Sequence, residues 1–292
     1  MLSILIPVYN YNIFSMVSQI HNQVSDCHIT FEIRVYDDGS KQFSVKNNAI
    51  SNLSNTTYKE LPNNIGRSAI RNLLAAEAKY DLLLFIDAGT VPKSDNFIKD
   101  YLDHPEYSVV SGGMTYLSKP PKKPFTLRWA YTKKRESSIQ KPSHTQPVIC
   151  SSNFLIQKEI FKRNPFDESL KKYGCEDVLF FDGITKKGIP IKHINNPVIH
   201  DAQDDATTFI KKTETAIENL IELIDTKKLP RNRYKVSKLY YKLERIRLDT
   251  LISLLFKATR NILKMNFNSS YPSILCYDLY RLGYFCLIKN KK

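Results

Sequence analysis

Charged side chains in this chain stand where they could bind an anion and accept a proton. Asp87 ends a buried apolar run, and Glu176 and Asp177 are adjacent residues that open a helix-like segment. Arg67 and Arg71 are four residues apart, so they share one face of a helix whose amino end attracts anions. These residue types suit a site that holds a diphosphate beside a carboxylate base.

Each of these residues also has an ordinary structural interpretation. Asp87 could turn the chain before Pro92, and acids in a first helical turn stabilise the helix dipole. The two arginines could be solvated on an amphipathic helix. Taken one at a time, the segments leave both interpretations open.

Two further positions could recognise a ligand. Tyr9 and Asp38 follow what we expect to be adjacent strands. A stacking ring and a carboxylate that accepts a hydrogen bond from an N–H group suit the binding of a flat nucleobase. The alternative is a hairpin-like turn with a surface tyrosine.

His200 and Asp201 end a later apolar strand, and a lone histidine is more often structural than a ligand.

The elements that position these residues alternate between strands and helices. Strands are predicted at residues 2–9, 31–37, 57–61 and 80–87, with helices after the first and third, and further strands at 107–116 and 148–156. This order predicts an α/β fold with a mostly parallel, doubly wound sheet. Such sheets bind ligands at the carboxyl ends of their strands.

Composition favours a globular intracellular protein. The chain has 292 residues, 42% of them apolar, which suits one large α/β domain with an appendage. Five cysteines without paired spacing favour a reducing compartment. The sequence shows neither a signal peptide nor a membrane-spanning stretch, so we expect a cytoplasmic location.

The balance of basic and acidic residues changes near residue 205. Residues 206–292 carry 18 basic and 7 acidic residues, whereas residues 1–205 carry 25 and 22. We therefore expect a catalytic domain at 1–205 and a basic, mainly helical extension at 206–292. Phe209, Ile217 and Ile224 belong to an apolar helical stripe, expected to pack on the catalytic domain.

The sequence of the basic extension is compatible with more than one role. From Arg231 onward it is amphipathic with interleaved aromatics, which favours contact with an anionic membrane surface. A helical cap or a homodimer surface is the alternative. Nucleic acid is not expected as a partner, because no nucleic-acid module is present.

Seven segments, IPVYN, VYDDGS, NIGRSAIRN, LLLFIDAGTVP, SSNFLI, GCEDVLFF and PVIH, together resemble the family 2 glycosyltransferases of the GT-A (Rossmann-like) fold, over roughly residues 1–202. The resemblance implies an inverting hexosyltransferase that uses a nucleotide-sugar donor. Pro7, Tyr9 and Asp38 match the nucleobase pocket, and Arg71, with Arg67, matches the nucleotide contacts.

The resemblance also implies the remaining roles. Asp87 matches the first acid of the Asp-x-Asp motif, Asp177 the general base, and His200 a histidine that completes the metal site in some members. Gly89 stands in place of the second acid. Either Asp87, His200 and waters hold Mn or Mg more weakly, or the arginines carry the charge, or the protein binds donor without catalysis. Because Mg needs few carboxylates, we expect weakened metal use.

For the acceptor, we expect a glycan or lipid-linked molecule. The resemblance suggests a growing surface glycan such as lipopolysaccharide or capsule, modified at the cytoplasmic face of the membrane. UDP is taken as the nucleotide of the donor. The alternative function is a catalytically impaired donor-binding or partner-binding subunit.

Overall fold

The computed structural model describes residues 1–137 and 149–291, and the chain packs as two compact units. The first consists of Met1–Tyr116, Glu136–Lys171 and Glu176–Asp201, and the second of Leu117–Arg135, Lys172–Cys175 and Ala202–Lys292. The second unit thus includes two short segments that precede residue 205. The division into domains at that residue stays a prediction.

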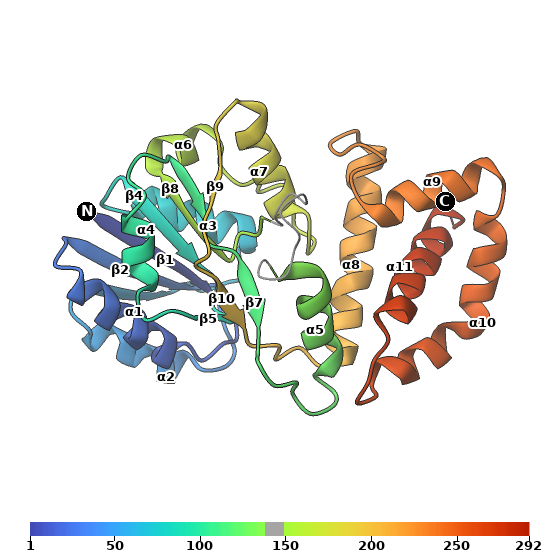
Figure 1. Cartoon of the computed structure of the whole chain (residues 1–292), viewed down its shortest axis with the longest axis horizontal. Helices are drawn as coiled ribbons and strands as arrows, with labels where there is room; N and C mark the ends of the chain where they lie inside the picture. The colour runs from blue at the N-terminus through green and yellow to red at the C-terminus, as the bar shows by residue number, and fades with distance from the viewer. Residues whose placement is uncertain (138–148, 292) are drawn as a thin grey trace. The chain divides into compact units, whose positions relative to one another are not determined.

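The first unit is built on a seven-stranded sheet with helices on both faces (Figure 1). The strand order is β3-β2-β1-β4-β8-β6-β9. The strands are β1 (Leu2–Val8), β2 (Phe31–Asp37), β3 (Thr56–Glu60), β4 (Leu82–Ile86), β6 (Val109–Ser111), β8 (Asn153–Gln157) and β9 (Lys192–His193). The helices are α1 (Phe14–Asp26), α2 (Ser44–Asn48), α3 (Arg67–Glu77), α4 (Phe97–Leu102), α6 (Lys158–Arg163) and α7 (Glu176–Lys186).

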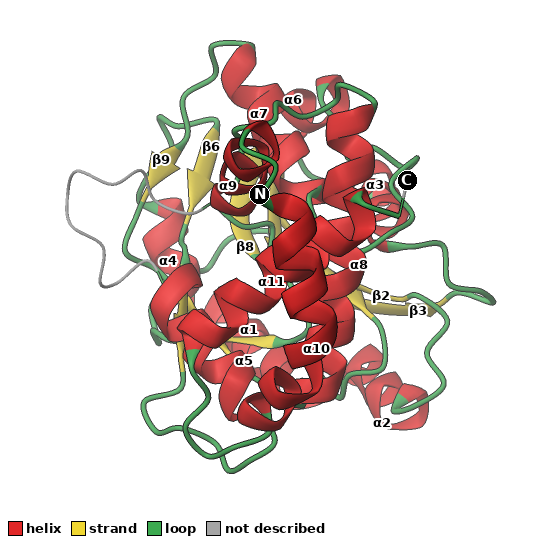
Figure 2. Cartoon of the chain, turned by 90° about the vertical axis from the view of Figure 1, so that its right-hand side faces the viewer, coloured by secondary structure: helices red, strands yellow, loops and turns green. Residues whose placement is uncertain are grey.

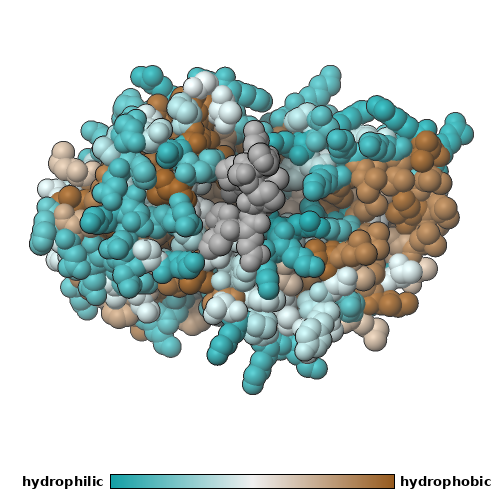
Figure 3. Space-filling model, viewed as in Figure 1, coloured by the Kyte–Doolittle hydropathy of each residue, from teal (hydrophilic) through white to brown (hydrophobic). Residues whose placement is uncertain are grey.

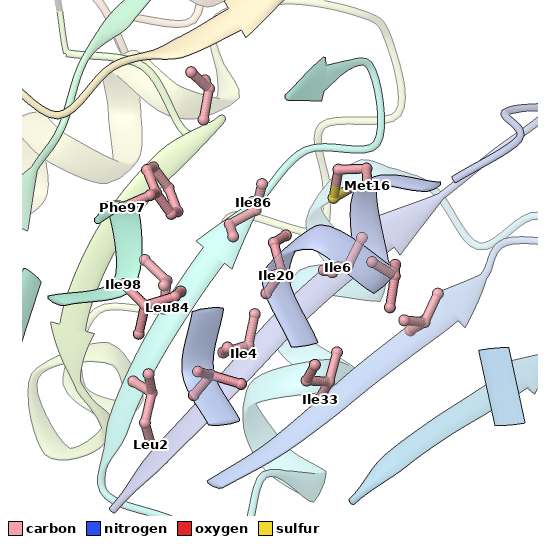
Figure 4. Packing of buried hydrophobic residues seen from close by; sticks show 14 of the residues in the cluster. Leu2, Ile4, Ile6, Met16, Ile20, Ile33, Leu84, Ile86, Phe97 and Ile98 are labelled. Carbon is pink, nitrogen blue, oxygen red and sulfur yellow. The ribbon is translucent and has the colours of Figure 1, made fainter. Parts of the chain in front are cut away.

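Alternation along the central strands divides the core into two layers. Ile4 of β1 and Leu84 of β4 lie in one layer with the apolar residues of α1 and α4, as Figure 4 shows. Leu5 and Phe85, one position further along, lie in the other layer with residues of α3, α6 and α7. Because successive strand side chains point to opposite faces and both faces are covered, β4 is apolar throughout and β1 is apolar except at Ser3.

The prediction of a mostly parallel α/β sheet is confirmed. β1 pairs in parallel with β2 and β4, and β2 pairs in parallel with β3. β8 is the exception, because it runs antiparallel between β4 and β6. It begins at Asn153, later than the predicted strand at 148–156, and residue 148 lies outside the described residues.

A small sheet borders the end of β4. It has the order β5-β10-β7, with β5 (Thr90–Pro92) antiparallel and β7 (Met114–Tyr116) parallel to β10 (Val198–His200). Since β5 begins three residues after Asp87, this sheet braces the turn that carries that acid.

The second unit is helical, and α8, α10 and α11 are prominent in Figure 2. Its helices are α5 (Thr126–Tyr131), followed by a π-helical turn (Thr132–Glu136), α8 (Ala206–Asp225), α9 (Lys235–Arg245), α10 (Asp249–Phe267) and α11 (Ile274–Lys289). Asp205 caps α8 by accepting a hydrogen bond from the N–H of Thr208 at 2.7 Å. Within residues 1–137 and 149–291, no helix combines the length and apolarity needed to cross a bilayer.

α11 is the central helix of this unit and contacts α8, α9 and α10. The predicted apolar stripe of α8 is buried, and polar contacts join the two helices. Tyr284 donates to Glu218 at 2.6 Å, Tyr280 donates to Glu214, and the hydroxyls of Thr213 and Tyr277 are 2.7 Å apart. The packing of α8 on the catalytic domain stays a prediction.

A buried amide fastens β8 to its surroundings. The side-chain nitrogen of Asn153 donates to the carbonyl oxygens of Gly113 (2.9 Å) and Asn196 (2.8 Å), and its oxygen accepts from the hydroxyl of Tyr101 (2.5 Å). A Cβ on Gly112 would lie 2.4 Å from that hydroxyl, so only glycine allows the three groups to meet.

We therefore expect Asn153→Ala to destabilise the first unit. Two buried carbonyl groups and one hydroxyl would lose their partner, which should lower the free energy of unfolding by about 3 kcal/mol. Urea denaturation followed by circular dichroism measures this change. Asn52→Ala, at an exposed position, is the control and should change stability by less than about 0.5 kcal/mol. Equal stability of the two variants would contradict the role of this network.

Candidate active site

Asp87 stands at the carboxyl end of β4, where the chain turns toward β5. The Asp87 N–H donates to the carbonyl oxygen of Ser152 at 3.1 Å. The hydroxyl of Thr90 donates to the carbonyl oxygen of Asp87 at 2.7 Å. Its side chain is 30% exposed and accepts a hydrogen bond from Nη2 of Arg71 at 2.5 Å. The strand end therefore presents a carboxylate that is oriented but still accessible.

Arg71 is held from several sides. Its side chain is only 4% exposed, its Nη1 donates to the carbonyl oxygen of Arg67 at 3.1 Å, and its guanidinium lies 5.5 Å from the centroid of the Phe166 ring. Its buried Nε has no hydrogen-bond partner in the described part of the chain. Arg71 thus orients Asp87, and its predicted contact with the nucleotide stays a prediction.

Arg67 differs from Arg71 because its side chain is 51% exposed. It is the first residue of α3, as the sequence predicted, and its Nη1 lies 3.4 Å from Oε1 of Glu176. An ion pair of this length on a half-exposed side chain contributes little to stability. Glu176 itself is buried, and its Oε2 has no partner among the described residues.

Asp177 is the second residue of α7, beside Glu176. Its Oδ1 accepts a hydrogen bond from the N–H of Val178 at 2.8 Å. Burial, and then the adjacent Glu176 carboxylate, raise the pKa of Asp177 to about 7. Near neutral pH the carboxyl group is therefore shared between its protonated and ionised forms, which suits a group that accepts a proton during a reaction.

Cys150 connects the two acids electrostatically. Burial raises the pKa of its thiol to about 12, and the carboxylates of Asp177 and Asp87 add to this rise. The charges of Asp87 and Asp177 thus act on the same thiol, although the two acids are far apart in the sequence. The thiol lies 3.0 Å from the hydroxyl of Ser152 and stays protonated at neutral pH. No sequence motif pointed to an effect of these acids on Cys150.

Tyr9 and Asp38 follow the adjacent strands β1 and β2, as predicted. The Asp38 N–H donates to the carbonyl oxygen of Val8 at 2.8 Å. The Asp38 carboxylate is buried and accepts from the N–H groups of Ile65 (2.6 Å) and Gly66 (3.0 Å). Asp38 thus ties the end of β2 to the start of α3, and burial raises its pKa.

The ring of Tyr9 is 47% exposed, and Pro7 lies within β1. The contact of Pro7, Tyr9 and Asp38 with a nucleobase stays a prediction. An open groove of about 530 Å³ lies nearby at the start of α3, with Gly66 and Lys171 in its lining. Neither Asp87 nor Asp177 lines this groove, so it lies beside the acids rather than among them.

The position after Ala88 is closely packed. A Cβ added to Gly89 would lie 3.3 Å from the ring and the hydroxyl of Tyr11, which is tighter than an ordinary contact. Tyr11 therefore fills the space next to the position where the family motif has its second acid. The sequence did not identify this pairing, because 78 positions separate the two residues.

His200 is paired with Thr90 in the ladder between β10 and β5, so its backbone lies beside the turn that follows Asp87. Its Nδ1 is 3.9 Å from Oδ1 of Asp201. Among the described residues, no three His, Cys, Asp or Glu side chains gather closely enough to hold a metal ion. The described residues therefore offer a cation fewer than three side-chain ligands of these types.

Comparisons with known proteins agree with this architecture. The model for the family "Glycosyl transferase family 2" matches residues 3–164, which is more than half of the chain. A search of curated proteins found no match. The chain is similar to the mannosyltransferase PcManGT from Pyrobaculum calidifontis, solved in complex with GDP-Man and Mn²⁺. The TM-score is 0.52 and the identity 16%, over 77% of this chain and 64% of that one.

Two other solved structures are more distant in shape. S. aureus TarS has a TM-score of 0.47 and 19% identity, over 76% of this chain and 39% of that one. The catalytic domain of Drosophila β1,4-galactosyltransferase 7, in complex with xylobiose, has a TM-score of 0.43 and 14% identity, over 68% of this chain and 69% of that one. The chain thus spans less than two thirds of the length of TarS and of PcManGT. The family match and the α/β sheet together show that the chain belongs to glycosyl transferase family 2.

Proposed function

We propose that the chain is an inverting glycosyltransferase of the hexosyltransferase type that moves a sugar from a nucleotide-diphosphate donor to an acceptor hydroxyl. Family membership supports the reaction class. The observation that carries the assignment of roles is the contrast between two acids of the first unit. One of them, Asp87, is ion-paired with Arg71, and the other, Asp177, has a raised pKa.

In the proposed reaction, Asp177 removes the proton from the acceptor hydroxyl while the hydroxyl oxygen attacks the anomeric carbon. The bond from that carbon to the diphosphate oxygen breaks, and the nucleotide diphosphate leaves with the electron pair. The proton remains on Asp177 until the product departs. Because the oxygen attacks opposite the leaving group, one displacement inverts the anomeric configuration.

Charge on the leaving diphosphate needs cationic groups nearby. We assign this role first to Arg67, because its guanidinium is half exposed and stands at the amino end of α3, where backbone N–H groups favour anions. Arg71 acts through Asp87, which it orients. On the nucleoside side, we assign Tyr9 and Pro7 to contact with the base, and Asp38 to holding the loop before α3.

We include a divalent cation, Mn or Mg, in the proposal, with Asp87 as its protein ligand and His200 as the second candidate. A bound cation would supply Lewis-acid stabilisation of the diphosphate. Gly89 offers no side-chain ligand, so phosphate oxygens and water would complete the coordination shell, as is common for Mg²⁺.

For the substrates, we take UDP as the donor nucleotide and a growing surface glycan, such as lipopolysaccharide or capsule, as the acceptor. The five cysteines are free thiols, which suits a reducing cytoplasm. The second candidate function is a donor-binding subunit without catalysis, which is favoured by the packing of Tyr11 against Gly89.

Asp177→Asn tests the assignment of the base. The amide keeps the size of the side chain but cannot accept the proton, so we expect turnover to fall by about 10²–10⁴-fold. Donor affinity should change less than about threefold, since the base does not hold the donor. A screen of nucleotide sugars, with product release and calorimetric binding as readouts, measures both quantities.

Asp182→Asn, on the same helix α7, is the matched control and should keep the wild-type rate. Unchanged turnover in Asp177→Asn would exclude it as the base. Donor binding without turnover in the wild-type protein, when lipid-linked acceptors are also supplied, would favour the binding subunit.

The raised pKa of Asp177 predicts the pH dependence. Only the ionised carboxylate can act as a base, so kcat/KM for the donor should rise with pH and level off above a midpoint near 7. An ordinary aspartate would place the midpoint near pH 4. Glu176→Gln removes one charge that raises this pKa, so the midpoint should move to lower pH. A wild-type midpoint near pH 4, or an unchanged midpoint in Glu176→Gln, would refute this explanation.

Donor binding should depend on metal through Asp87. We expect the Kd for the nucleotide diphosphate, measured by titration calorimetry, to be at least about tenfold lower with Mn than with chelator. Asp87→Asn should abolish this difference, while Asp81→Asn, at an exposed position before β4, should preserve it. Identical wild-type affinity and turnover in chelator would remove the cation from the proposal.

A further inference from the structure

α10 has two apolar faces, and the second unit covers one of them. Phe256 and Phe267 are buried in the cluster that includes Tyr277 and Tyr280 of α11. On the opposite side of the helix, successive apolar residues recur at spacings of three and four, which keeps them on one face. This outer face consists of Leu251, Leu254, Leu255, Ala258, Ile262 and Met265.

The outer face of α10 is strongly exposed. Its leucines, isoleucine and methionine have exposed fractions of 52–75%. Leu275 and Leu279 of α11, and Ile246 and Leu248 before α10, are also exposed. Figure 3 shows apolar residues gathered over the region of α10 and α11. Contiguous apolar surface of this kind marks an interaction site rather than ordinary exposure.

Basic residues are frequent in the sequence around this face. Residues 231–268 contain ten Lys and Arg but only two Asp and Glu. Exposed members include Lys238, Lys242, Arg245, Arg247 and Lys257, and none of these forms an ion pair within the part of the chain that the structure describes. The segment therefore combines exposed apolar side chains with positive charge that the protein itself does not neutralise.

We propose that the outer face of α10 binds the interfacial region of an anionic lipid bilayer. Leucine, isoleucine and methionine side chains can enter the boundary between headgroups and acyl chains, while lysines and arginines pair with anionic headgroups. A second copy of the chain fits less well, because a two-fold interface would bring two unneutralised basic clusters together. This inference is independent of the proposed reaction, since it concerns only the helices of the second unit.

Vesicle sedimentation tests the proposal without any donor or acceptor. The purified full chain is mixed with vesicles of phosphatidylcholine, or of phosphatidylcholine with about one third phosphatidylglycerol, and should sediment with the second kind only. Leu254→Glu combined with Ile262→Glu should reduce the bound fraction by at least about tenfold, because charges are placed where apolar groups enter the bilayer. Arg247→Glu combined with Lys257→Glu should also weaken binding, and added salt should weaken wild-type binding.

Val45→Glu is the matched control, because Val45 is a 91% exposed apolar residue in the first unit. It should sediment like the wild type. All variants should keep the wild-type thermal unfolding midpoint, since every changed side chain is exposed. The proposal is overturned if the wild type binds neither vesicle, or if the α10 variant binds as well as the wild type. It is also overturned if the wild type is a dimer that the α10 variant converts to a monomer without any vesicle binding.

Discussion

The ion pair between Arg71 and Asp87 is the contact on which the candidate site depends. Arg71 is almost completely buried, so removal of Asp87 would leave a buried charge uncompensated. Since Arg71 belongs to α3 and Asp87 follows β4, the pair fixes the helix against the strand end. The same helix carries Arg67, which pairs with Glu176 at the start of α7. The helix α3 therefore contacts both the end of β4 and the start of α7.

The three acids of the site differ in their cationic neighbours within the described part of the chain. Two arginines form two ion pairs, one with Asp87 and one with Glu176. Asp177 is the third carboxylate and has no ion-pair partner within the described residues. Burial, and then the charge of Glu176, oppose its ionised form, and its pKa rises although the charge of Arg71 acts in the opposite direction. A carboxyl group poised near neutrality therefore follows mainly from burial rather than from a special residue type.

Much of this arrangement could be predicted from the sequence, because it depends on local patterns. Apolar runs that end in Asp37 and Asp87 predicted strand ends, and the helices α3 and α7 begin where glycines and charged residues indicated. The antiparallel direction of β8 could not be predicted, since an apolar run carries no direction. The effect of both acids on the Cys150 thiol depends on tertiary packing, as does the burial of the Asp38 carboxylate against N–H groups 27 and 28 residues away. Which face of α10 stays exposed was equally hidden, because both faces are apolar.

The packing of Gly89 against Tyr11 has a consequence for how this sequence can change. An aspartate at position 89 would place its Cβ 3.3 Å from the Tyr11 ring, so Tyr11 would have to shift at the same time. The two positions are therefore coupled, because an acid at position 89 would require the Tyr11 ring to move by a few tenths of an ångström. The cost of that substitution depends on how readily the ring can shift. The freedom of Tyr11 to move, rather than the glycine alone, therefore decides whether this turn can carry a second acid.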